Sequence, residues 1–73
     1  MRTDTRNFEM VWGKKPRGRG LWCFIVNGYD EAGDLKSQRF FESGTVMVAK
    51  KRACHKFRTE HGAKRIEEVQ VLA

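Results

Sequence analysis

The stretch GKKPRGRG at residues 13–20 places four cations among three glycines and one proline. Ammonium and guanidinium groups bind anions, and phosphate is an anion that groups of Lys and Arg readily neutralise. Proline lacks an N–H donor and glycine is conformationally loose, so the stretch disfavours regular structure. We therefore predict a flexible, anion-binding segment, the basic loop. Its cations are Lys14, Lys15, Arg17 and Arg19.

A second group of cations falls on one side of a helix expected at residues 46–61. Glu60 is the only acid in that segment, so ion pairs between residues four apart hardly offset the repulsion among the cations. A merely solvated helix face is the alternative, but the imbalance favours contact with phosphates or with acidic residues of another protein. The cations expected to make this contact are Lys51, Arg52 and Arg58.

The net charge of +6 and the isoelectric point near 9.8 indicate an anionic partner. The charge is concentrated in two blocks. Residues 1–20 carry a net +4 and residues 50–65 a net +6, whereas residues 21–49 carry −2. One or two basic surfaces are therefore expected rather than a uniformly charged shell.

Cysteine and histidine side chains offer little catalytic or metal-binding chemistry. No C-x-x-C pair is present, and adjacent helical residues such as Cys54 and His55 point about 100° apart. The thiols of Cys23 and Cys54 are expected to be reduced and buried, with a single disulfide between them as the alternative. No recognisable catalytic motif groups an acid, a base and a nucleophile. We expect a binding protein, not an enzyme, without metal or cofactor.

Five elements are predicted to position the cations. The segment TRNFEMVW at residues 5–12 alternates as a strand, with Phe8, Met10 and Trp12 on one side. The segment LWCFIVNGYD at residues 21–30 is the clearest strand and ends near Asn27 and Gly28. It is apolar on both faces, so a central and largely covered place in the sheet is expected. A turn at residues 29–34 and the strand LKSQRFF at residues 35–41 complete an antiparallel hairpin.

The helix at residues 46–61 has a signal at each end. Ser43 or Thr45 offers an N-cap, and Gly62 suits the position after the last turn. Its apolar stripe contains Val46, Ala53 and Phe57, with Met47, Ala49 and Cys54 beside it. A last strand, RIEEVQVL at residues 65–72, should turn Val69 and Val71 towards the helix.

The predicted fold is α+β, a small antiparallel sheet of three to four strands packed against one helix in the order β-β-β-α-β. Residues 1–20 are expected as a basic arm and loop, either flexible or containing an edge strand, and residues 21–73 as one compact domain. The longest apolar run, residues 21–26, is far shorter than the roughly 20 residues that cross a membrane. We expect a cytoplasmic monomer that makes no membrane contact.

Two resemblances suggest a DNA-binding domain. Lys14, Lys15 and the segment PRGRG resemble the AT-hook, whose extended Arg-Gly-Arg lies in the minor groove, although Gly20 replaces its second proline. Residues 20–57 resemble the arm-binding domain of phage-type integrases, which places a three-stranded sheet in the major groove. The residues that match this domain are Trp22, Asp30, Gly33, Arg39, Phe40 and Phe41.

The full chain resembles small phage-encoded transcription regulators that bind host bacterial RNA polymerase. The resemblance rests on size, basic composition and the plan of two antiparallel strands, a helix and a closing strand. It implies contact with the N-terminal region of the polymerase β′ subunit, competition with σ that inhibits initiation, and suppressed termination, in the cytoplasm of an infected bacterium. The expected polymerase contacts are Arg6, Phe8, Met10, Val11 and Trp12; the basic loop would meet nearby RNA or DNA phosphates. The alternative for residues 8–12 is an ordinary strand of the sheet.

Overall fold

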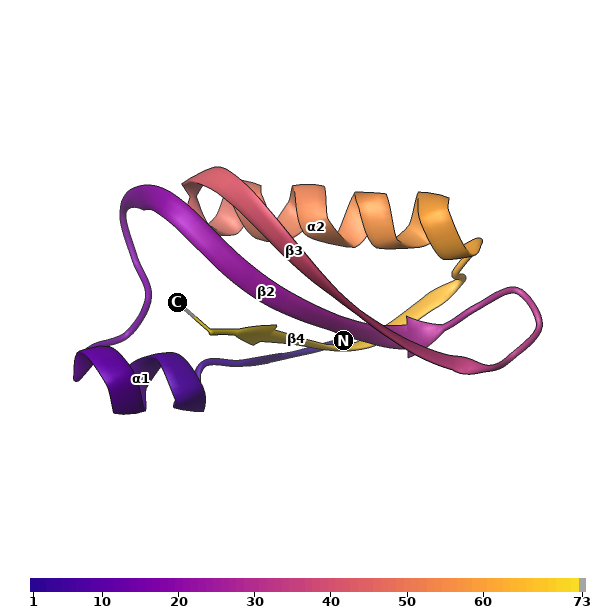
Figure 1. Ribbon diagram of the computed structural model, residues 1–73, viewed down its shortest axis with the longest axis horizontal. Helices are drawn as coiled ribbons and strands as arrows, with labels where there is room; N and C mark the ends of the chain where they lie inside the picture. The colour runs from indigo at the N-terminus through magenta and orange to yellow at the C-terminus, as the bar shows by residue number, and fades with distance from the viewer. Residues whose placement is uncertain (73) are drawn as a thin grey trace.

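The computed structural model describes residues 1–72, which form a four-stranded sheet and two helices. The elements are β1 (Arg2–Asp4), α1 (Arg6–Trp12), β2 (Arg19–Tyr29), β3 (Leu35–Thr45), α2 (Val46–His61) and β4 (Arg65–Val71). Helix α2 lies along one face of the sheet, and α1 lies at one end of the molecule (Figure 1). The predicted α+β class, a small sheet packed against a helix, is confirmed.

The strands lie side by side in the order β1-β4-β2-β3. The predicted hairpin is present, because β2 and β3 pair antiparallel over eleven residues each, from Arg19 opposite Thr45 to Tyr29 opposite Leu35. β4 pairs antiparallel with the other edge of β2. β1 adds to β4 in parallel, so the sheet is mixed rather than purely antiparallel. β2 is central, as its apolar sequence predicts.

The structure differs from the sequence prediction at residues 6–12, which form helix α1 instead of an extended strand. Phe8 and Trp12 are four residues apart, so they share a helix face, and their ring centroids lie 6.1 Å apart. Before the helix, Asp4 accepts a hydrogen bond from the backbone N–H of Arg6. After it, Gly13 adopts the left-handed conformation at a φ of 68° and donates its N–H to the carbonyl of Glu9. The prediction of a strand at residues 5–12 is therefore wrong, because these local contacts favour a helix.

Helix α2 has the predicted ends. The side chain of Thr45 accepts a hydrogen bond from the N–H of Val48 at 3.3 Å, and Gly62 closes the helix with its N–H bonded to the carbonyl of Arg58. The apolar face is close to the predicted one, except that Met47 is 63% exposed. The buried residues of α2 are Ala49, Ala53, Cys54 and Phe57.

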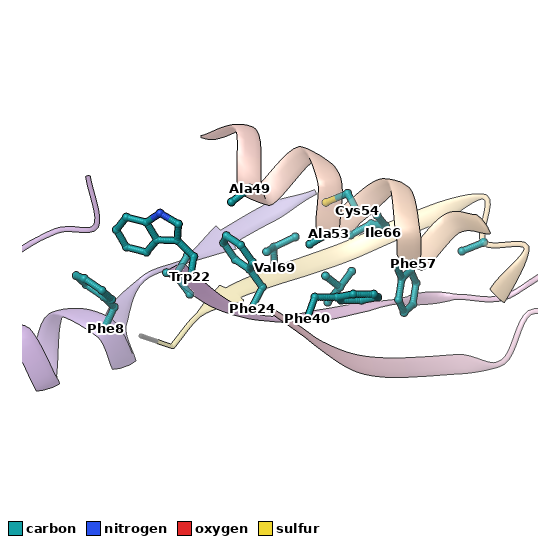
Figure 2. Packing of buried hydrophobic residues seen from close by; sticks show 13 residues of the cluster. Phe8, Trp22, Phe24, Phe40, Ala49, Ala53, Cys54, Phe57, Ile66 and Val69 are labelled. Atoms are coloured by element: carbon teal, nitrogen blue, oxygen red, sulfur yellow. The ribbon is translucent and has the colours of Figure 1, made fainter. Parts of the chain in front are cut away.

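The core lies between α2 and the sheet, and α1 extends it (Figure 2). Trp22, Phe24 and Val26 of β2 point into it, together with Val69 and Val71 of β4, as predicted. Strand β4 ends at Val71, which pairs with Phe24, so β4 does not reach as far as Trp22, two residues earlier in β2. Phe8 packs against Trp22 there, with ring centroids 5.6 Å apart. Residues 2–8 therefore belong to the same sheet and core as β2, β4 and α2.

The sheet face opposite α2, which we call the open face, is only partly covered. Leu21 is 69% exposed and Ile25 is half-buried, whereas Cys23 is buried. This corrects the expectation that β2 would be covered on both faces, because no helix packs on the open face in the described part of the chain (Figure 1). Cys23 and Cys54 are both buried and free, so no disulfide joins them.

Candidate nucleic-acid interface

The basic loop joins α1 to β2 and presents all four of its cations to solvent. Lys14, Lys15 and Arg17 lie between the two elements, and Arg19 is the first residue of β2. Gly18 adopts a φ of +84°, which favours glycine and turns the chain just before the strand. The four side chains are thus held near one another by a short segment fixed at both ends.

None of the seven cations expected to bind nucleic acid forms an ion pair with an acid among residues 1–72. The acids that do form ion pairs neutralise other cations: Arg2–Glu68, Arg6–Asp4, Lys36–Asp30, Lys56–Glu42 and Arg65–Glu67. The positive charge of the basic loop and of Lys51, Arg52 and Arg58 is therefore available to an external anion.

The basic loop lies close to the first turns of α2. Pro16 lines a small cavity of about 160 Å³ together with Met47 and Lys50, residues that are more than thirty positions away in sequence. The two basic blocks of the sequence thus approach each other at this end of the molecule, and the Nζ of Lys50 donates a hydrogen bond to Thr3 at 3.2 Å.

The three predicted cations of α2 are exposed on the side of the helix turned away from the core. Arg52 donates a hydrogen bond to the carbonyl of Ser43 at 3.2 Å, which draws it towards β3. Lys56, by contrast, pairs at 2.6 Å with the buried carboxylate of Glu42 and supports the fold. Lys51 and Arg58 are seven residues apart and so share one outward stripe.

A cleft of about 210 Å³ opens between α1, the basic loop and the start of β2. Aromatic rings form its apolar wall, and all four cations of the basic loop line it. Trp22 is held in place because its indole N–H donates to the carbonyl of Gly44 at 3.0 Å. Trp12 is 56% exposed and is the ring that an incoming ligand can reach.

The five residues expected to contact polymerase do not share one environment. Met10, Val11 and Trp12 are 84%, 70% and 56% exposed, and they lie together at the end of α1. Phe8 is only 5% exposed and packs in the core, so it supports the helix and cannot act as an exposed anchor. Arg6 is exposed, but its guanidinium is paired with Asp4.

We expect Arg6→Gln to raise the pKa of Asp4 from about 2 towards its ordinary value of 3.8. The side chain of Arg6 donates hydrogen bonds to both carboxylate oxygens of Asp4, and its backbone N–H adds a further one, which together lower this pKa. A pKa that is lower in the folded protein stabilises the fold above the unfolded pKa, and this contribution is lost as the pH falls through about 2. An NMR titration of the carboxyl carbon measures the shift.

Arg2→Gln is the matched control for that titration. Arg2 pairs with Glu68, and hydrogen bonds from Gln70 and Arg2 lower the pKa of Glu68. This variant should therefore raise the pKa of Glu68 and leave that of Asp4 almost unchanged. An Asp4 pKa that stays near 2 without the Arg6 guanidinium would contradict the assignment of the shift to this ion pair.

Two features of the structure weigh against the DNA-binding resemblances, one of backbone conformation and one of charge. An AT-hook holds its Arg-Gly-Arg extended, whereas here Gly18 turns the chain and Arg19 is already paired opposite Thr45 in the sheet. An integrase arm-binding domain would place its sheet in the major groove of DNA, which requires cations on the exposed sheet face. On the open face, however, acids neutralise Arg2 and Arg65, which leaves Arg39 and, at the far end of β2, Arg19 as its cations without an acid partner within residues 1–72.

The adjacent residues Cys54 and His55 do not face one another. Cys54 is buried and His55 is exposed, so they point to different sides of α2. Burial raises the pKa of the Cys54 thiol, which therefore stays protonated at neutral pH. Within residues 1–72, no group of three or more His, Cys, Asp or Glu side chains could hold a metal ion. No helix in that part of the chain is long and apolar enough to cross a membrane.

Sequence reasoning identified the cations of the cleft but missed its aromatic wall. Phe8, Trp12 and Trp22 meet only because residues 6–12 are helical and pack against the start of β2. The spacing of four residues between Phe8 and Trp12 was the one local signal for this arrangement.

Comparisons with protein families, with curated proteins and with solved structures found no match to this chain. Its function is therefore inferred from the chemistry of the surfaces described above.

Proposed function

We propose that the protein is a non-enzymatic transcription regulator that binds host bacterial RNA polymerase through α1 and holds the basic loop against nucleic-acid phosphates in that complex. One observation supports this function above the others: three exposed apolar side chains at the end of α1 directly precede four cations without acid partners. A polymerase offers protein surface beside a nucleic-acid channel, and a surface of this composition can use both.

The apolar half of this surface has the character of a protein contact. Met10, Val11 and Trp12 follow one another on a helix of only seven residues, so the helix exposes apolar side chains on several sides. Met is enriched at protein–protein interfaces, and Met10 and Val11 precede Trp12, whose ring lines the cleft beside the basic loop. Phe8 holds this helix on the core and the cap at Gly13 closes its last turn, which keeps the anchors in a fixed position.

The resemblance to phage regulators supplies the finer parts of the proposal. These are contact with the N-terminal region of the β′ subunit, inhibition of initiation by σ displacement, and suppression of termination. The protein would act as a monomer in the cytoplasm of the infected host, without a cofactor. A DNA-binding domain of integrase-arm or AT-hook type is the competing function, and the neutralised open face and the turn at Gly18 weigh against it.

We expect the double variant Met10→Ser/Val11→Ser to recover at least tenfold less polymerase than wild type from a nuclease-treated bacterial lysate. Anchor residues contribute about 2 kcal/mol or more each at an interface, and nuclease treatment removes nucleic-acid bridges. The measurement is a pull-down at moderate salt followed by quantification of the polymerase subunits. A further variant with Lys14, Lys15, Arg17 and Arg19 all changed to Ala tests whether the basic loop contributes.

The matched control is Met47→Ser/Val48→Ser, which changes two exposed apolar residues of α2. This control should recover polymerase as wild type does. If wild type recovers no polymerase, while the purified protein binds duplex DNA tightly with a steep salt dependence, the regulator function is overturned in favour of a DNA-binding domain.

A further inference from the structure

We infer that the cleft beside α1 is a binding site for single-stranded RNA, in which a base stacks on the indole of Trp12 while phosphates contact the cations of the basic loop. The inference rests on the proposed function for the choice of RNA, since a growing transcript is a single strand that polymerase releases. The site itself is argued from its shape, its rings and its charge.

Two of the three aromatic rings of the cleft are buried and support the third, which is exposed. Phe8 and Trp22 are 5% and 6% exposed, and their centroids lie 5.6 Å apart, so they form the fixed back of the site (Figure 2). Trp12 lies against Phe8 with an interplanar angle of 32° and keeps 56% of its surface exposed. A half-exposed indole braced from behind is a suitable surface for stacking a planar base.

The charge around these rings is of one sign. Lys14, Lys15, Arg17 and Arg19 all line the cleft, and no acid does. None of the four has an ion-pair partner among residues 1–72, so a bound strand would not have to displace an internal carboxylate. Cations beside an aromatic platform are the combination that tracks a single strand, because phosphates and base faces alternate along it.

The size and lining of the cleft limit what can occupy it. A volume of about 210 Å³ is smaller than the roughly 300 Å³ or more of sites that enclose a whole small ligand, so the cleft suits one base of a longer chain. A base within a duplex has both faces stacked, and only a single strand can offer one to Trp12. The lining has no amide, hydroxyl or carboxylate side chain, so its side chains able to reach a base edge are the same Lys and Arg that would contact phosphates. We therefore expect binding that tolerates any base sequence.

The test measures fluorescence anisotropy of a labelled oligo-U with purified protein, in the absence of polymerase. Trp12→Ala should weaken binding roughly 5- to 150-fold, the loss that removing one stacked base produces. Trp12→Phe, which keeps an aromatic face, should lose much less. Phe41→Ala is the matched control because Phe41 is a 62% exposed ring on the open face that does not line the cleft, and the affinity of this variant should equal that of wild type.

Salt dependence tests the phosphate contacts separately. Four contacts to a single strand predict a slope of about −3 for log affinity against log salt concentration, and changing all four loop cations to Ala should bring it close to zero. Circular dichroism shows whether each variant is folded. If Trp12→Ala does not fold, the inference is still tested by the small loss of affinity expected for Trp12→Phe and by the salt slope.

Three results would overturn the inference: affinity unchanged in folded Trp12→Ala, tighter binding to duplex DNA than to oligo-U, or a clear preference for oligo-dT, which would indicate a DNA strand instead of the transcript. Similar affinity for oligo-U and oligo-dT supports it, because nothing in the cleft reads the sugar. The failure of the proposed function looks different. A protein that binds oligo-U through Trp12 but recovers no polymerase would retain this site and lose only the polymerase role.

Discussion

Gly28→Ala is expected to lower the free energy of unfolding by about 3 kcal/mol, the upper end of the usual cost of overpacking a core. A Cβ at this position would lie 2.6 Å from the carbonyl oxygen of Arg65, 2.9 Å from a ring carbon of Phe57 and 3.1 Å from the Cα of Ile66. Two of these atoms belong to the backbone of β4 and cannot rotate away. Relief would require β4 to separate from β2, where the pairing is already irregular between Asn27 and Gly28.

Gly20→Ala is the matched control for this substitution. Gly20 lies in the same strand, and a Cβ there meets no atom within 4 Å. Its free energy of unfolding should stay within about 0.5 kcal/mol of wild type, as for most surface changes. Urea denaturation followed by circular dichroism measures both variants. Equal stability of the two would contradict the close approach of β4 and Phe57 to Gly28.

The role of Gly28 shows how far local sequence patterns reach. Asn27 and Gly28 predict the end of a strand, because this pair favours turns, yet β2 continues to Tyr29. A side chain is excluded at position 28 by residues distant in sequence, because Phe57 of α2 and Arg65 of β4 approach it closely. A sequence window around residue 28 contains no information about those neighbours, so the true constraint could not be predicted.

The hairpin and α2 were predictable because their signals are local and agree with one another. Alternating aromatic and β-branched residues define β2, and Thr45 and Gly62 bracket α2 with their caps. Helix α1 was not predictable in the same way. The spacing of two residues between Phe8, Met10 and Trp12 fits a strand. The spacing of four residues between Phe8 and Trp12 fits a helix equally well, and the segment has only seven residues to decide between them. Packing of Phe8 against Trp22 helps to favour the helix.

The candidate site likewise has a part that could be predicted from the sequence and a part that could not. Its cations follow from composition, since the basic loop is a contiguous run and needs no tertiary information to be found. Its cleft depends on α1 folding back on β2, which brings Trp12 beside residues that are up to ten positions away. The absence of acid partners around the loop is also a tertiary property, because all five ion pairs of residues 1–72 form elsewhere.

Phe40→Ala is expected to leave little folded protein, whereas Phe41→Ala should remain folded. Phe40 is 6% exposed in the core and Phe41 is 62% exposed on the open face, although they are neighbours in β3. Replacing a buried Phe by Ala costs about 3 to 5 kcal/mol, and a domain of this size has about 3 to 5 kcal/mol of stability in total. Removing the exposed ring should cost less than about 1 kcal/mol.

The two variants together test the register of the sheet, since side chains alternate between faces along a strand. Phe40 lies opposite Phe24 and Phe41 opposite Cys23. A shift of one residue would exchange the two rings, so Phe41→Ala would become the destabilised variant. Thermal unfolding followed by circular dichroism measures the difference, and Phe40→Leu, which keeps most of the buried volume, should restore a cooperative transition. That outcome would show that lost packing at Phe40, rather than an altered strand, explains the unfolding.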